Sequence, residues 1–232
     1  MSIVIKLSGL KIGVISDSDY IKHRCSDYLS EGDPDFSVSV TKPEKERERE
    51  LTPGLPDEYY DFVCVYRNIC VRLPVYDRLL VHSAVIDAGG RGYAFAAKSG
   101  VGKTTHIRLW KDNFDDVDII NGDKPIFRYD GEGFYACGTP WCGKEGYNIN
   151  REVKLEAFTF LARGENNEIS ILDKKSAADA IFKQILVPKD VLGAAKTLEL
   201  CDKLLKNLPV LGMSCNMNKD AATTARNMLD SL

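Results

Sequence analysis

The segment AFAAKSGVGKTTHI, residues 94–107, constrains the fold of this 232-residue chain more than any other stretch. It begins as an apolar run and continues into a turn with two glycines. Ile107, Trp110 and Phe114 then recur at the spacing of one helix face. A strand, a glycine-rich turn and a helix form the setting in which backbone N–H groups can surround a phosphate. This setting predicts an α/β fold and disfavours the alternative of a chance glycine-rich turn.

The turn matches the phosphate-binding pattern GxxxxGK(S/T) at every fixed position except the first. In that pattern Lys103 can bridge the terminal phosphates of a nucleotide, and the Thr104 hydroxyl can ligate Mg²⁺. Ala97 stands where the first glycine is expected, and a small residue suffices there if its φ stays negative. We therefore expect ATP with Mg²⁺ to be bound. The expected nucleotide contacts are Ser99, Gly100, Val101, Gly102, Lys103, Thr104 and Thr105.

Two further residues are candidates for the same site. Residues 115–120 read as a strand, and Asp123 follows it, where a carboxylate can hold Mg²⁺ or take a proton from a hydroxyl. The alternative for Asp123 is a simple turn residue after Gly122. His82 falls in an apolar run at 79–87, predicted to be one strand that pairs with the strand entering the loop. Its alternative role is that of a core histidine.

The composition excludes several other classes of protein. A formal net charge of -3 gives no broad basic surface for nucleic acid, so none is expected as a partner. The seven cysteines contain no CxxC pair, which fits free thiols in a reducing compartment, with Cys137 and Cys215 expected in the core. No apolar run is long enough to span a membrane. A cytoplasmic protein without membrane contact is therefore expected, and a homo-oligomer is compatible with the sequence.

The pattern of the whole chain divides it into two portions. Residues 1–75 read as a β-rich portion with strands at 3–7, 11–16, 36–40 and 61–66, and with a charged loop or short exposed helix at 41–51. Residues 76–232 read as the nucleotide-binding portion. Its predicted hairpin has Asp130 and Gly131 near the tip. Its strands are predicted at 167–173 and 209–215, its helices at 175–186, 190–206 and 219–231, and residues 153–162 fit a strand or a helix.

Residues 80–125 resemble the catalytic module of HPr serine kinase/phosphorylase. That family has a strand with a histidine, a loop of the type SGxGK(S/T), and a strand that ends in two aspartates. Residues 75–232 are also similar to a group of short bacterial HPr-kinase-like proteins, often found near peptide-modifying genes. The matching segments here are GTPWCGK (138–144), FLARGENN (160–167) and PVLGMSCNM (209–217). The resemblance implies a mixed-sheet phosphate-loop fold of the phosphoenolpyruvate carboxykinase/HPr-kinase type.

The resemblance also assigns roles. It matches Lys103 and Thr104 to the loop lysine and hydroxyl, His82 to the strand histidine, and Asp123 to the second aspartate. Gly122 replaces the first aspartate, so one carboxylate stands where two are expected. The implied activity is transfer of the γ-phosphate of ATP to a hydroxyl on a peptide, a small protein or a small molecule. Either His82 or Asp123 would take the proton.

Three further residues are candidate substrate contacts. Trp141 and Lys144 lie in a glycine-bounded loop that could receive the acceptor or the base, and the alternative is a packed hairpin end with Trp141 in the core. Arg163, with Asn167, could reach the γ-phosphate, since a guanidinium matches phosphate oxygens, or could lie in a solvated turn. The second function compatible with the sequence is a nucleotide-binding regulatory or assembly protein. Carboxykinase chemistry is disfavoured because the chain lacks the additional Arg and Lys clusters.

Overall fold

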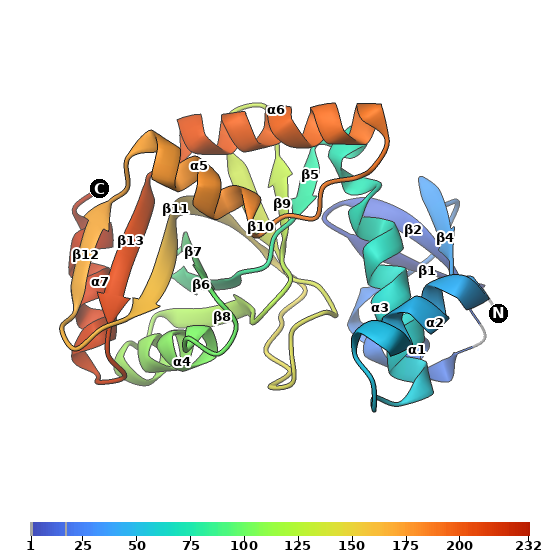
Figure 1. Ribbon diagram of the computed structural model, residues 1–232, viewed down its shortest axis with the longest axis horizontal. Coiled ribbons are helices and arrows are strands. Elements are labelled where there is room, and N and C mark those ends of the chain that lie inside the picture. The colour runs from blue at the N-terminus through green and yellow to red at the C-terminus, as the bar shows by residue number, and fades with distance from the viewer. Residues whose placement is uncertain (1, 17) are drawn as a thin grey trace.

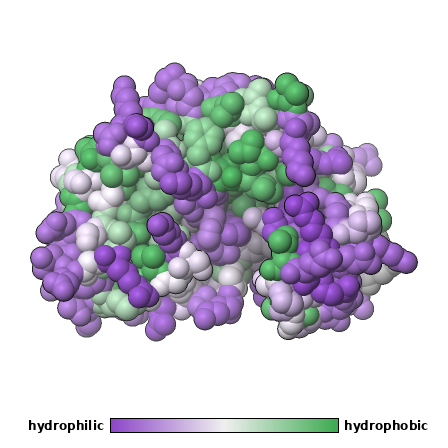
Figure 2. All heavy atoms as spheres, viewed as in Figure 1, coloured by the Kyte–Doolittle hydropathy of each residue, from purple (hydrophilic) through white to green (hydrophobic). Residues whose placement is uncertain are grey.

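The computed structural model describes residues 2–16 and 18–232 as a mixed α/β protein with two sheets (Figure 1). A four-stranded sheet lies in the N-terminal part, and a nine-stranded sheet with both parallel and antiparallel pairs occupies the rest. The same view of the surface shows a hollow between the N-terminal part and the remainder (Figure 2). No helix of the described residues is both long and apolar enough to cross a membrane.

The N-terminal part is less β-rich than the sequence predicted. Its strands, in the order β3-β1-β2-β4, are β1 (Ser2–Leu7), β2 (Leu10–Ile15), β3 (Leu29–Ser30) and β4 (Phe36–Ser39). Its helices are α1 (Asp19–Arg24), α2 (Lys42–Leu51) and α3 (Asp57–Cys70), with the short 3₁₀ turns η1 (Ser26–Tyr28) and η2 (Leu73–Tyr76). The helices therefore supply much of this part.

The strand predicted at 61–66 is wrong, because these residues lie inside α3. The six-residue run is too short to separate a strand from a buried helix segment. The longer window shows helical spacing, with Phe62, Val65 and Ile69 all buried on one face. Asp57 and Glu58 in the first turn also favour the helix through its dipole. The charged segment 41–51 forms a helix, α2, which was one of its two predicted alternatives.

The larger sheet follows the order β5-β9-β10-β11-β7-β6-β8, with β13 pairing β11 and β12. Its strands are β5 (Arg78–Leu80), β6 (Ala84–Ala88), β7 (Arg91–Ala97), β8 (Val117–Asn121), β9 (Ile126–Tyr129), β10 (Phe134–Cys137), β11 (Glu152–Arg163), β12 (Glu168–Ile171) and β13 (Val210–Cys215). The predicted hairpin around residues 130–131 is present as β9 and β10, and residues 153–162 form a strand. The single strand predicted at 79–87 is wrong, because a bend at His82 separates β5 from β6.

Helices cover both faces of this sheet (Figure 1). The helix α4 (Lys103–Asn113) and the helix α7 (Asp220–Asp230) pack on the face that contains Phe95, while α5 (Lys174–Phe182) and α6 (Val191–Asn207) pack on the face that contains Ala94. This alternation follows from the two-residue period of a strand. Burial on both faces explains why β7 reads as a continuous apolar run.

One of the hydrophobic clusters contains residues from both parts of the chain. Leu80, Ile126, Cys137 and Trp141 from the larger part pack with the apolar residues of β1, β2, β4 and α3. The Nε1 group of Trp141 donates a hydrogen bond to the carbonyl of Phe62 over 3.0 Å. The N-terminal part is therefore packed directly against the segment that follows β10.

Candidate functional site

The sheet topology brings three chain segments to one edge. Strand β6 runs antiparallel to both β7 and β8, so the start of β6 lies beside the ends of the other two. Within these pairs Ala84 faces Phe95, and Val85 faces Asn121. His82 just before β6, the glycine-rich loop after β7 and Asp123 just after β8 therefore meet at the same edge.

The glycine-rich loop (residues 98–102) joins β7 to α4. Gly100 and Gly102 have φ angles of 77° and 123°, which side chains with a Cβ adopt only with strain. Helix α4 begins at Lys103, and its N-cap, Gly102, offers no side-chain hydrogen bond to the first turn. The first turn of α4 includes Thr104 and Thr105, and no side chain caps its N–H groups. These free N–H groups and the positive end of the helix dipole favour the binding of an anion.

Ala97 does not distort the loop. It is the last residue of β7, is buried against α4 and α7, and is not among the described residues with positive φ. The position therefore requires no glycine. A small side chain fits there because β7 continues in regular pairing with β11 as far as Ala97.

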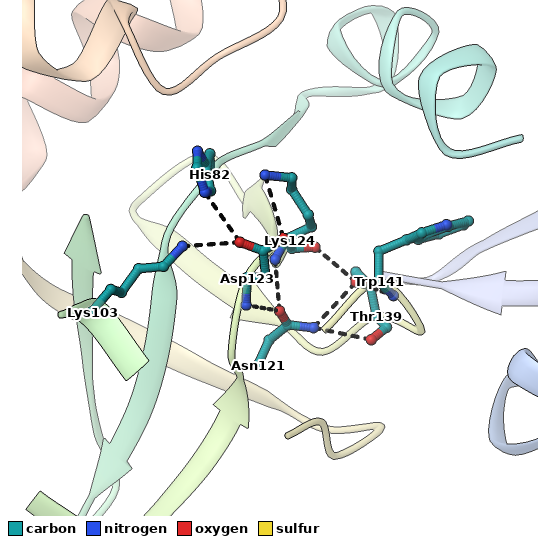
Figure 3. Close-up of polar contacts among 7 residues, drawn as sticks. All are labelled: His82, Lys103, Asn121, Asp123, Lys124, Thr139 and Trp141. Atoms are coloured by element: carbon teal, nitrogen blue, oxygen red, sulfur yellow. Dashed lines mark hydrogen bonds and ion pairs between the residues drawn. The ribbon is translucent and has the colours of Figure 1, made fainter. Parts of the chain in front are cut away.

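Asp123 lies at the centre of a charged cluster (Figure 3). Its Oδ1 atom is 3.0 Å from Nζ of Lys103 and 3.1 Å from Nε2 of His82. Its Oδ2 atom is 3.5 Å from Nζ of Lys124. The structure thus brings together Lys103, His82 and Asp123, which the sequence placed in one site. It adds Lys124, which the sequence analysis had not selected.

The cluster holds Asp123 ionised. Burial by itself would raise the pKa of the carboxyl, but the hydrogen bond from His82 and the charges of Lys124 and Lys103 outweigh it and hold the pKa far below its usual range. Burial lowers the pKa of Lys103 and of Lys124, and the charge of Asp123 opposes that change. Each lysine would therefore gain from a second anion placed nearby.

Asn121 fixes the turn that carries Asp123. Its fully buried side chain accepts hydrogen bonds at Oδ1 from the N–H groups of Asp123 (2.9 Å) and Lys124 (2.8 Å). Its Nδ2 group donates to the Thr139 carbonyl over 3.0 Å. Asparagine side chains commonly accept a hydrogen bond from the backbone two residues further on in turns. The sequence NGDK therefore indicates such a turn. Asn121 and Lys124 are the residues of this cluster that the sequence analysis missed.

Gly122 is required by close packing. A Cβ atom at this position would lie 2.9 Å from the carbonyl oxygen of Cys142, and the Gly122 N–H donates to the Tyr147 carbonyl over 2.8 Å. Its φ is not positive, so the reason is space and not backbone conformation. The position where an acid was expected is thus closed by the backbone of residues 142–147.

The three predicted substrate contacts occupy different environments. Trp141 is only 6% exposed and stacks on Phe62 with the ring centres 5.2 Å apart, which is the packed alternative. The Lys144 side chain is almost fully exposed. Arg163, at the end of β11, donates hydrogen bonds to the carbonyls of Gly100 and Val101. Its guanidinium group therefore holds the glycine-rich loop in place.

The segments 160–167 and 209–217 also meet beside this loop. The Asn167 side chain accepts a hydrogen bond from the Asn216 N–H over 3.0 Å. Met217 Cε lies 3.5 Å from the place a Cβ on Gly102 would take. Cys137 is buried, whereas Cys215, expected in the core, is half-buried.

The described residues contain no group of three or more His, Cys, Asp or Glu side chains arranged for a metal ion. A magnesium ion that arrives with a nucleotide needs only one or two protein ligands besides phosphate and water. Thr104, in the first turn of α4, and Asp123, just after β8, carry oxygen atoms of the kind that such an ion takes as ligands.

Residues 60–214 match the family described as SynChlorMet cassette protein ScmC, and the chain belongs to this family. A comparison with curated proteins finds no match. Among solved structures the chain is similar to the Hpr(Ser) kinase/phosphatase from Coxiella burnetii, with 9% sequence identity and a TM-score of 0.38. That similarity covers 66% of this chain and 97% of the other. At these values it does not establish a shared activity.

Proposed function

We propose that this protein is an ATP-dependent phosphotransferase that moves the γ-phosphate of ATP to a hydroxyl. One observation carries the proposal. At the N-terminal end of α4, which has no side-chain cap, the Asp123 carboxylate lies 3.0 Å from Nζ of Lys103 and 3.1 Å from Nε2 of His82. An anion site, a lysine and a carboxylate that can accept the hydroxyl proton recur in sites that transfer a phosphoryl group to a hydroxyl, and His82 lies beside that carboxylate.

The nucleotide phosphates would bind at the first turn of α4. The free N–H groups and the helix dipole favour them there, and Lys103 is the nearest cation to join them. Lys103 now pairs with Asp123. If the Lys103 side chain moved from Asp123 to the phosphates, Asp123 would keep His82 and Lys124 as partners. Mg²⁺ would be held by Thr104 and Asp123 and would neutralise charge on the phosphates.

Asp123 and His82 would position the acceptor hydroxyl and receive its proton. In the protein without nucleotide the hydrogen bond from His82 and the charges of Lys103 and Lys124 make Asp123 a weak base. His82, which contacts the same carboxylate, is the second acceptor for the proton. A hydroxyl of serine or threonine on a peptide or small protein is the proposed acceptor, and a small alcohol is the alternative.

The test is the turnover of ATP by Asp123→Asn. We expect a loss of roughly 10² or more in phosphate transfer or ATP hydrolysis, from the lost base and lost charge, with ATP binding much less affected. Asp118→Asn is the matched control because Asp118 lies in β8, towards its other end, and pairs only with surface cations. Equal turnover by wild type and Asp123→Asn would contradict the proposal.

One observation favours a second function, a nucleotide-binding regulatory or assembly protein. The position of a second acid is closed by the Cys142 carbonyl, so the site has a single carboxylate. ATP binding by wild type without consumption of ATP, with or without hydroxyl acceptors, would support this alternative.

A further inference from the structure

A cleft of about 520 Å³ opens between the N-terminal part and the segment that follows β10. One wall comes from α1 and α3, and the other comes from residues 141–144 and from the turn after β8. Asp123 and Lys124 belong to its lining. The hollow between the two parts of the molecule is visible in Figure 2. Asp123 thus connects the candidate phosphate site with a second space that the sequence analysis had not predicted.

The walls of this aromatic cleft are apolar and firmly held. Trp141 stacks on Phe62 and lies 6.0 Å from the ring of Tyr66, and its N–H group is bonded to the Phe62 carbonyl. Tyr59 and Leu55 lie nearer the solvent, and each is 38% exposed. A ligand side chain that is large and apolar or aromatic would bind to these rings most strongly, because the favourable free energy of burial rises with the apolar area that is buried.

The charges of the aromatic cleft disfavour a basic ligand. Arg24, Lys124 and Lys144 are cations of its lining, and Asp123 is the one carboxylate among the described residues that line it. Glu145, beside the lining, pairs with Lys144 over 3.9 Å and leaves Arg24 and Lys124 as the cations that face a ligand. The Asp123 carboxylate is already paired with Lys103 and His82. Arg24 is fixed with its guanidinium 5.5 Å from the Phe62 ring centre and 3.3 Å from the Pro140 carbonyl. A ligand with lysine or arginine beside its hydroxyl would therefore be repelled.

We propose that the aromatic cleft is the acceptor site, and that it takes a peptide whose hydroxyl-bearing residue is flanked by large apolar or aromatic side chains. The inference rests on the proposed phosphotransferase function. The volume lies within the range of ligand pockets and exceeds what one hydroxyl-bearing side chain needs, so neighbouring residues enter with it. Residues 20–66 of the N-terminal part then serve as the substrate-recognition element.

The transfer step is balanced by the groups already named. The acceptor oxygen attacks the γ-phosphorus and forms a new O–P bond, while the bond from that phosphorus to the β–γ bridging oxygen breaks. ADP leaves with the electron pair of that bond. The hydroxyl proton passes to Asp123 or to His82. The aromatic cleft contributes position only, because its side chains hold the residues on either side of the hydroxyl.

The experiment compares three acetylated and amidated pentapeptides with serine at the centre, flanked by phenylalanine, alanine or lysine, and includes 2-phenylethanol as a free alcohol. We expect wild type to phosphorylate the phenylalanine peptide with kcat/KM at least about tenfold above the alanine peptide, and the lysine peptide least. Leu55→Ala and Tyr59→Ala should each reduce that preference severalfold. Leu51→Ala is the matched control, since Leu51 is 60% exposed on α2 and lies outside the cleft.

Hydrolysis of ATP without any acceptor separates the two claims. If wild type neither binds nor hydrolyses ATP, the proposed function fails. If wild type hydrolyses ATP but phosphorylates no peptide, or has no preference for phenylalanine, the inference about the acceptor is overturned and the proposed function stands. Phosphorylation of 2-phenylethanol alone overturns the peptide as occupant. An unchanged preference in Leu55→Ala and Tyr59→Ala overturns the assignment of the cleft.

Discussion

Replacement of Gly122 should damage the site and not restore a missing acid. A Cβ atom at residue 122 would stand 2.9 Å from the Cys142 carbonyl oxygen and 3.4 Å from Tyr147 Cβ. Both neighbours belong to the backbone segment that follows Trp141, so they cannot rotate away as a long side chain would. Overpacking of this kind costs about 1–3 kcal/mol. In a chain of this size that corresponds to a decrease in Tm of about 2–12 °C for Gly122→Ala.

Gly122→Asp should lower turnover of ATP as well as Tm. The added carboxylate would push residues 142–147 outward and with them one wall of the aromatic cleft. Differential scanning calorimetry measures the first effect, and steady-state ATP consumption measures the second. Gly133→Ala is the control, because the nearest atom to its added Cβ is the mobile Lys154 Cε at 3.7 Å. A Gly122→Asp protein with wild-type Tm and faster turnover would refute this reasoning.

Two further predictions concern the glycine-rich loop and the helix that follows it. Burial lowers the pKa of His106 to about 4 from an ordinary value of 6.5. Between these values the unfolded chain binds more protons, so stability is lost as the pH falls from about 6.5 to about 4, by about 3 kcal/mol. Urea unfolding at pH 7 and pH 5 should show a smaller loss of unfolding free energy in His106→Gln than in wild type. The glutamine amide oxygen can still accept the hydrogen bond from the Trp110 N–H. An equal loss in both proteins would exclude His106 as the cause. Ala97→Gly should bind ATP within about threefold of wild type by calorimetric titration, because Ala97 ends a regular strand, and binding more than tenfold tighter would identify Ala97 as a defect of the loop.

The sequence predicted the larger part of the fold well because its signals are local and strong. The strand, glycine-rich turn and helix at 91–113 are present, as are the hairpin at 126–137 and the three C-terminal helices. Lys103, Asp123 and His82 could be placed in one site because strands β6, β7 and β8 alternate in direction along one sheet.

The remainder depends on contacts between distant segments. The run at 61–66 has the composition of a strand. Its helical spacing appears only over the longer window 57–70, whose apolar face packs with β4 and Trp141. His82 lies in a bend and not in a strand, since its N–H group bonds to the Gln184 carbonyl. The sequence around Gly122 does not reveal that the Cys142 backbone approaches this residue and leaves no room for an acidic side chain. The aromatic cleft joins Tyr59 to Asp123 across the two parts of the chain, and no local pattern marks such a pairing.

The most direct test of the nucleotide site is the thermal stability of wild type and Lys103→Ala with and without ATP and Mg²⁺. Lys111→Ala is the control, because Lys111 lies in the last turn of the same helix and forms an exposed ion pair with Asp118 over 3.8 Å. Loss of Lys103 leaves Asp123 paired with His82 and Lys124, so the variant should fold. At 100 times the Kd, ATP should stabilise wild type and Lys111→Ala by about 2.7 kcal/mol and Lys103→Ala by much less. An equal shift in all three proteins, or no shift in wild type, would contradict nucleotide binding at the glycine-rich loop.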